Sequence, residues 1–269
     1  MKIRPFYPDD VPLFLALAAA EGWSSDPWEF AFILESFPRG CLAVEENGRP
    51  VAFVTAIRYG ASGWIGNLIV AEEYRGRGYG TLLMGRAMGE LLDSGVRTVW
   101  LTASAQGRPL YEKMGFREMD GVVRWRGTAT GGAHWHDDLV APDELVALDR
   151  AGWGDDRRCV LSAVAARGIV LRENGGFLVT QPCGSGFQLG PWAAEGRGVA
   201  GELLGRALSR LQGGAQVLLD VPARNSAAAS VLAHAGFAAC GRTVLMCVGD
   251  EPAYKPEKIF ALATLGSVG

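Results

Sequence analysis

The sequence predicts an α/β (α+β) protein made of two similar halves, each a mixed, mainly antiparallel sheet flanked by helices. Three observations lead to this prediction. Short strand patterns alternate with amphipathic helix patterns along the chain. Hairpin turn signals such as Asn47-Gly48 separate neighbouring strands, which is typical of antiparallel pairs. A glycine-rich segment between a strand and a helix also occurs twice.

The first half begins with two helices. Asp9, Asp10 and Pro12 are N-cap and first-turn signals for a helix that runs to about Glu21, and Asp26-Pro27 starts a second helix. The remaining predicted elements, in order, are strands at about 41–45, 51–59 and 64–70, a helix at 82–92, a strand at 98–103, a short helix at 108–114 and a strand at 116–126.

The second half follows the same plan. Its predicted elements are helices at about 142–150 and 156–167, strands at 169–172, 177–181 and 187–192, a helix after the second glycine turn, a strand at 217–221, a helix at 225–234 and two further strands.

The halves are repeats of each other. Residues 74–88 align with residues 194–208, and Gly115-Phe116 recurs as Gly236-Phe237 in nearly the same register. We therefore expect a duplicated protein with one domain at 1–127, a linker at 128–140 and a second domain at 141–269. The Gly-Thr-Ala-Thr-Gly-Gly sequence at 127–132 has the composition of a linker.

Composition narrows the class of protein. With 49 % apolar residues among 269, both halves can bury a core, and a net charge of −3 without a basic block argues against a nucleic-acid partner. Five cysteines without a CxxC pair favour a reducing cytoplasm, and no signal peptide or membrane-length apolar run is present. We expect a cytoplasmic monomer or homodimer. We interpret His134-x-His136 as plain loop and predict no metal.

The segment Arg75-Gly-Arg-Gly-Tyr-Gly80 carries the clearest functional signal. It follows the apolar strand end at Leu68–Val70 and opens a helix, so main-chain N–H groups and the helix dipole converge on one point. Main-chain N–H groups arranged in this way bind phosphate. The spacing does not match the Rossmann fingerprint, and no Gly-Lys-Ser/Thr ends the loop as in a P-loop.

The pattern R-x-x-G-x-G in this segment resembles the pyrophosphate loop of the GCN5-related N-acetyltransferases (the GNAT superfamily). The resemblance implies that acetyl-CoA is the cosubstrate and that no metal takes part. It also implies a set of cofactor-binding residues, which act largely through their main-chain N–H groups: Leu68, Ile69, Val70, Arg75, Gly76, Arg77, Gly78, Tyr79, Gly80 and Thr81.

The resemblance extends to a second motif and assigns a catalytic residue. In Leu110-Tyr-Glu-Lys-Met-Gly-Phe116, Tyr111 matches the family tyrosine that faces the thioester sulfur and stabilises or protonates the leaving thiolate. In the second copy, Glu195 replaces Arg75 and Leu232 replaces Tyr111. We therefore place the chemistry in the first half and expect a degenerate cofactor site in the second.

Most of the chain also resembles a bacterial tandem-GNAT family with a degenerate C-terminal acetyltransferase-like domain. In the second half the similarity rests on Gly190-Pro-Trp192, Asp220-Val-Pro-x-x-Asn225, Gly236-Phe237, Met246 and the tail 258–262. In the first half Glu21-Gly-Trp-Ser24 and Asp26 fit the same family. This resemblance specifies the fold and does not name the substrate.

The acceptor site is less defined. The strand before the loop, Trp64-Ile-Gly-Asn67, has no carboxylate to act as base, and a water held by main-chain carbonyls is one alternative. Glu21, Trp23 and Asp26 flank the turn between the first two helices, which borders the acceptor pocket in this fold. Glu21 and Asp26 also have simpler interpretations, a helix-end charge and an N-cap.

These observations predict an acetyl-CoA-dependent N-acetyltransferase that acts on a small-molecule amine by direct attack. The second domain would shape the acceptor site. Two alternatives remain open: a non-catalytic acyl-CoA-binding or regulatory protein, and a protein N-acetyltransferase. Tyr111 together with the intact Arg75 loop favours catalysis, because a protein that only binds has no need of the phenol.

Overall fold

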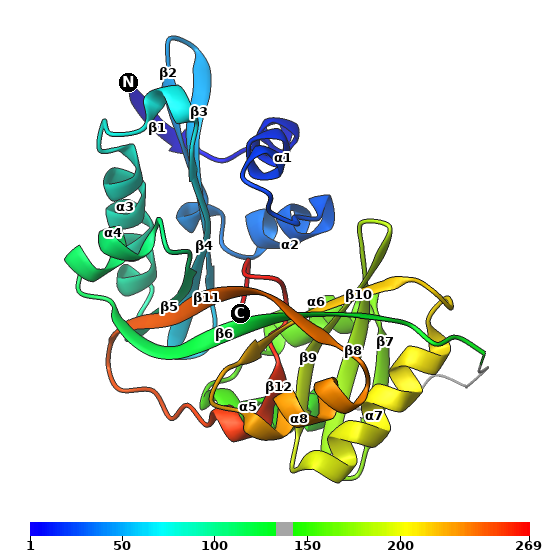
Figure 1. The fold of residues 1–269 in the computed structure, drawn as a ribbon. Coiled ribbons are helices and arrows are strands. Elements are labelled where there is room, and N and C mark those ends of the chain that lie inside the picture. The colour runs from blue at the N-terminus through cyan, green and yellow to red at the C-terminus, as the bar shows by residue number, and fades with distance from the viewer. Residues whose placement is uncertain (133–141) are drawn as a thin grey trace.

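The computed structural model describes residues 1–132 and 142–269. Within them, strands from both halves form one continuous twelve-stranded sheet with the order β1-β2-β3-β4-β5-β11-β6-β10-β9-β8-β7, and β12 pairs with β9 (Figure 1). Each half contributes a mixed, mainly antiparallel part of this sheet with helices against it, so the predicted fold class is confirmed.

The strands are β1 (Lys2–Pro5), β2 (Leu42–Glu46), β3 (Arg49–Arg58), β4 (Ser62–Val70), β5 (Thr98–Ala103), β6 (Arg117–Thr128), β7 (Ile169–Glu173), β8 (Gly176–Cys183), β9 (Gly186–Ala194), β10 (Gln216–Pro222), β11 (Ala238–Gly249) and β12 (Ile259–Ala261). The α-helices are α1 (Val11–Ala20), α2 (Pro27–Ser36), α3 (Tyr79–Asp93), α4 (Arg108–Lys113), α5 (Pro142–Trp153), α6 (Arg158–Arg167), α7 (Arg197–Arg210) and α8 (Ser226–His234). The sequence prediction missed β1, a short strand that ends in proline and, among the described strands, pairs with β2 alone.

Helices cover both faces of the sheet in the first half. Helices α1 and α2 lie on one face and α3 and α4 on the other (Figure 1). The alternation of side chains along β3 serves both layers: Phe53 and Ile57 belong to the core that contains Phe14 of α1 and Phe30 of α2. The intervening Val54 belongs to the core with α3. A strand buried on both faces is mostly apolar, and the buried part of β3, Val51–Ile57, is apolar except for Thr55.

The last strand of each half completes the other half's part of the sheet. Strand β11 pairs with β5, β6 pairs with β10, and β6 and β11 also pair with each other. In the sequence repeat β6 corresponds to β11, and β5 corresponds to β10. Because equivalent strands of a repeat have similar residue patterns, β6 and β11 can exchange places. The sheet therefore continues across residue 127, where the sequence repeat predicts the first domain to end. The domain boundary itself stays a prediction.

Strands β4 and β5 part from each other after a short parallel stretch. Their pairing covers only Ser62–Trp64 against Thr98–Trp100. Beyond it, β4 carries an irregularity opposite β3, and Asn67 adopts a left-handed conformation with φ of 55°. The rest of β4 diverges, which opens the sheet beside Leu68–Val70.

Two further searches cover only the described residues. No helix there is long and apolar enough to cross a bilayer. No group of three His, Cys, Asp or Glu side chains in this part of the chain is placed to hold a metal ion. His134, His136 and most of the predicted linker lie outside the described residues.

Candidate functional site

A pocket of about 560 Å³ lies where β4 and β5 diverge. Its lining includes residues from the helix turn after α1, from β4, from α4 and from the strands shared by the two halves. It brings together many of the residues predicted from sequence: Glu21, Trp23, Leu68, Ile69, Val70, Arg75, Gly80 and Tyr111. Segments far apart in the sequence thus meet at one opening in the sheet.

The glycine loop presents a row of free main-chain donors. Gly76 and Gly78 have φ angles of 75° and 83°, which a residue with a side chain rarely adopts, and Gly78 is the N-cap of α3. Among the described residues, no acceptor takes a hydrogen bond from the N–H groups of Gly76 to Thr81. Free donors at the N-terminus of a long helix bind anions such as phosphate. The loop is therefore suited to an anion such as phosphate.

The arginine that opens the loop ties it to its surroundings. Arg75 Nε donates to the carbonyl of Val70 at 3.0 Å, and its guanidinium pairs with Glu21. It thereby joins the loop, the end of β4 and the turn after α1. Glu21, predicted as an acceptor-site residue, is thus both a pocket residue and the partner of Arg75.

Two other predicted loop residues direct their side chains to β2. Arg77 Nη1 lies 3.2 Å from Glu46 on β2, and the Tyr79 hydroxyl donates to the same carboxylate. This contact raises the pKa of the Tyr79 phenol. Gly76, Arg77, Gly78, Tyr79 and Thr81 form the rim of the loop and do not line the pocket.

Tyr111 lies in the pocket wall with its side chain mostly enclosed. It is 8 % exposed and packs against Phe116, with ring centroids 6.0 Å apart. A methyl group on Gly107 would come within 3.4 Å of its hydroxyl, so the phenol fits closely under the start of α4. Burial raises the pKa of Tyr111 to about 12. The hydroxyl is therefore protonated and a hydrogen-bond donor at neutral pH.

The structure separates the three predicted acceptor residues. Glu21 and Trp23 line the pocket, and Trp23 is 38 % exposed at its mouth. Asp26 does not line it. Its carboxylate accepts from Trp28 N–H at 2.9 Å as the N-cap of α2 and pairs with Arg167 of α6. The simpler interpretation of Asp26 fits these contacts.

A further part of the pocket wall comes from the shared strands and was missed by sequence reasoning. Arg124 on β6 makes a two-pronged ion pair with Asp220 on β10, each contact 2.7 Å, and donates to Leu265 O at 2.9 Å. Asp220 is 3 % exposed. Only the exchange of strands brings Arg124 beside Asp220, so no local signal in the sequence indicates this pair.

The second glycine loop differs in structure as well as in sequence. Glu195 occupies the position of Arg75, and its carboxylate lies so close to Gly175 that a methyl group there would be 2.8 Å from Glu195 Oε2. Leu232, at the position of Tyr111, is completely buried in the core of the second half. A carboxylate at this position repels phosphate.

Comparisons with known proteins agree with these features. The model of the acetyltransferase (GNAT) family matches residues 9–116, and that of the acetyltransferase (GNAT) domain matches residues 145–261. The [ribosomal protein bS18]-alanine N-acetyltransferase of Haemophilus influenzae is 32 % identical over 98 residues, which are 35 % of this chain and 67 % of the relative. An uncharacterized N-acetyltransferase of Methanocaldococcus jannaschii is 30 % identical over 112 residues, and the chain spans 48 % of its length.

Solved structures share the whole fold. A putative acetyltransferase from Pyrococcus horikoshii superposes with a TM-score of 0.86 at 24 % identity, covering 100 % of this chain and 95 % of that one. A tandem GNAT protein from the clavulanic acid biosynthesis pathway gives a TM-score of 0.61 at 14 % identity, covering 94 % and 99 %. The second of these confirms the predicted tandem arrangement. The chain therefore belongs to the GNAT acetyltransferase family and carries one copy of its domain in each half.

Proposed function

We propose that this protein is an N-acetyltransferase that transfers acetyl from acetyl-CoA to the amine of a small molecule, and that the first half carries the reaction. The observation that carries the proposal is that three features lie together: the diverging end of β4 and Tyr111 line one pocket, and the glycine loop with its unbonded N–H groups adjoins it through Arg75 and Gly80. In the second half, Glu195 stands in place of Arg75 and Leu232 in place of Tyr111, and β12 pairs with the strand that corresponds to β4.

Acetyl-CoA supplies an acyl group activated as a thioester. The N–H groups from Gly76 to Thr81 would hold its pyrophosphate, and the main chain of Leu68–Val70 would hold the pantetheine arm and polarise the thioester carbonyl. Tyr111 would donate a hydrogen bond to the departing sulfur. Arg75 would keep the loop and the strand end in register through its bond to Val70.

A small acceptor is favoured because the second half closes one side of the pocket. Arg124, Asp220 and Leu265 also line the pocket, and part of this wall comes from β10 and from residues after β12. A walled pocket of about 560 Å³ has the size of a small-molecule site.

A protein N-terminus is the second candidate acceptor, because the Haemophilus relative is described as a protein alanine N-acetyltransferase. The same match covers 35 % of this chain and 67 % of that relative, so the relative is about half as long. It cannot contain a full counterpart of the second half. The wall that the second half builds here is the feature that separates the two candidates.

The test is thiol release from acetyl-CoA across a panel of small amines and of short peptides with free N-termini, with acetyl-CoA binding measured by calorimetry. Turnover on small amines that exceeds turnover on peptides supports the proposal. Turnover on peptides alone supports the second candidate. Tight binding of acetyl-CoA without turnover on any acceptor would replace both by a regulatory acyl-CoA-binding role.

A further inference from the structure

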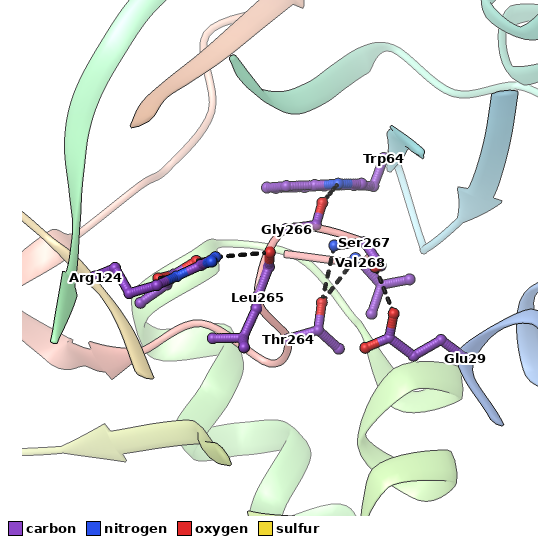
Figure 2. A network of polar contacts seen from close by, with 9 residues as sticks. Glu29, Trp64, Arg124, Thr264, Leu265, Gly266, Ser267 and Val268 are labelled. Carbon is purple, nitrogen blue, oxygen red and sulfur yellow. Dashed lines mark hydrogen bonds and ion pairs between the residues drawn. The ribbon is translucent and has the colours of Figure 1, made fainter. Parts of the chain in front are cut away.

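A segment from the end of the second half, residues 262–268, enters the opening between β4 and β5. Gly66 of β4 lies directly against it: a methyl group on Gly66 would be 2.5 Å from the main-chain oxygen of Ser267. On the other side, a methyl group on Gly266 would be 3.3 Å from the Thr102 hydroxyl of β5. Trp64 Nε1 donates to Gly266 O at 3.1 Å (Figure 2). Ser267 therefore forms part of the pocket floor, next to the diverging strand.

The segment is held in place by its own hydrogen bonds and by the wall of the pocket. Thr264 Oγ1 accepts from the N–H groups of Ser267 at 3.1 Å and Val268 at 3.0 Å, and Arg124 holds Leu265 O (Figure 2). Ser267 is 8 % exposed. Ser267 lines the pocket, and its hydroxyl is fixed by hydrogen bonding.

The carboxylate of Glu29 contacts Ser267 but does not line the pocket. The Ser267 hydroxyl donates to Glu29 Oε2, and Glu29 on α2 is 4 % exposed (Figure 2). The amide oxygen of Asn67, in the irregular part of β4, lies 3.5 Å from the same hydroxyl. Because the serine proton is directed to Glu29, the lone pairs of Ser267 Oγ are acceptors for a hydrogen on a bound ligand.

We propose that Ser267 and Glu29 together take the proton that the acceptor amine loses. Ser267 accepts it directly from the amine, and Glu29 receives a proton from Ser267. This inference rests on the proposed function. As the amine nitrogen forms its bond to the acetyl carbon, the carbon–sulfur bond breaks. The nitrogen gives one proton to Ser267 Oγ, which passes its own proton to Glu29 Oε2. The thiolate accepts a hydrogen bond from Tyr111 and becomes thiol with a proton from solvent, and Glu29 later returns its proton to solvent.

The surroundings of Glu29 suit this role. Burial raises its pKa to about 7, and the hydrogen bond from Ser267 opposes that rise. Three other titratable groups act on it: Asp26, the N-cap of α2, Arg167 at the end of α6 and Cys183 at the end of β8. Asp26 and Arg167 pair with each other, and burial raises the pKa of the Cys183 thiol so that it is neutral. A base that titrates near pH 7 accepts a proton and releases it readily.

The test compares the wild type with Glu29→Gln and Ser267→Ala by the pH profile of kcat, using an acceptor whose amine titrates well away from pH 7. We expect the wild-type kcat to fall on the acid side with a midpoint near pH 7. Both variants should lose kcat by about 10²-fold or more and lose this midpoint, while the KM for acetyl-CoA stays unchanged. Asp120→Asn is the matched control. It makes the same change at another buried carboxyl, bonded to Tyr254 outside the pocket, and should keep the wild-type profile.

The outcomes separate the role of Ser267 and Glu29 from the proposed function. A folded Glu29→Gln variant, checked by circular dichroism, with wild-type kcat and an unchanged midpoint would overturn the inference and leave the proposed function intact. An effect of Ser267→Ala on KM alone would overturn the route through Ser267. Absence of wild-type turnover on every acceptor would mean that the proposed function fails, and the inference falls with it.

Discussion

Replacing Tyr111 with phenylalanine removes one hydroxyl from the wall of the pocket and keeps the ring that packs against Phe116. The phenol donates to no acceptor among the described residues, so its loss leaves no partner unsatisfied there. We therefore expect the variant to fold as the wild type does and to bind acetyl-CoA with the same Kd.

The size of the effect on kcat depends on how the hydroxyl works. With a pKa of about 12 it lies roughly 3.5 pH units above an ordinary thiol, so complete proton transfer to the thiolate would be uphill by about 5 kcal/mol. A hydrogen bond to the charged sulfur is the more favourable role. Such a bond contributes about 1.5–3 kcal/mol, which corresponds to a fall in kcat of about 10- to 150-fold.

The assay is thiol release at saturating acetyl-CoA, together with calorimetric Kd. Tyr254→Phe is the control, because it removes a partly buried phenol that is bonded to Asp120 at 3.1 Å outside the pocket. Its kcat should match the wild type. A Tyr111→Phe enzyme with unchanged kcat would refute the assignment of Tyr111. A Kd that rises in parallel with the loss of kcat would show that the hydroxyl serves binding instead.

Three further predictions follow from the described contacts. Arg75→Glu introduces the residue of the degenerate copy, which removes a charged hydrogen bond and repels phosphate. It should weaken acetyl-CoA binding by about tenfold or more in calorimetry. Glu195→Arg is the control and should leave the Kd unchanged. Glu29 has a higher pKa in the folded than in the unfolded chain, so its contribution to stability is complete below pH 4.5 and is lost as the pH rises to about 7. Glu29→Gln should therefore be more stable than the wild type at pH 8, by up to about 3 kcal/mol in urea unfolding. Equal stability of the two proteins at pH 8 would contradict this. Asp149→Asn leaves the buried guanidinium of Arg157 without its carboxylate, and the urea midpoint should fall by the equivalent of about 3–5 kcal/mol, whereas a change below 1 kcal/mol would refute it.

Local chemistry explains which parts of the fold the sequence could predict. Glycine turns, helix caps and apolar periodicity act over a few residues, and they predicted nearly all helices and strands to within a few positions. The exception, β1, is short and ends in proline, so its pairing with β2 leaves no periodic signal. The exchange of β6 and β11 was also beyond prediction, because equivalent strands of a repeat have similar patterns and differ only in which neighbour they meet.

The site divides in the same way. The glycine loop, the end of β4 and Tyr111 follow one another within about 45 residues and were recognisable as motifs. Glu29 left one signal: it lies four residues before Ile33, on the face of α2 that is buried, where a carboxylate is unusual. Ser267 left none, because its position depends on the path of the chain through the second half.

The sequence by itself determined the family, the duplication and the half with the intact loop, since each depends on residue types at fixed spacing. Only the tertiary structure decided what the second half contributes. By exchanging a strand and sending residues 262–268 into the opening of the first half's sheet, it places Arg124 beside Asp220 and Ser267 beside Glu29. Contacts between residues about 100 and 240 positions apart arise from how the whole chain packs, which no short pattern specifies.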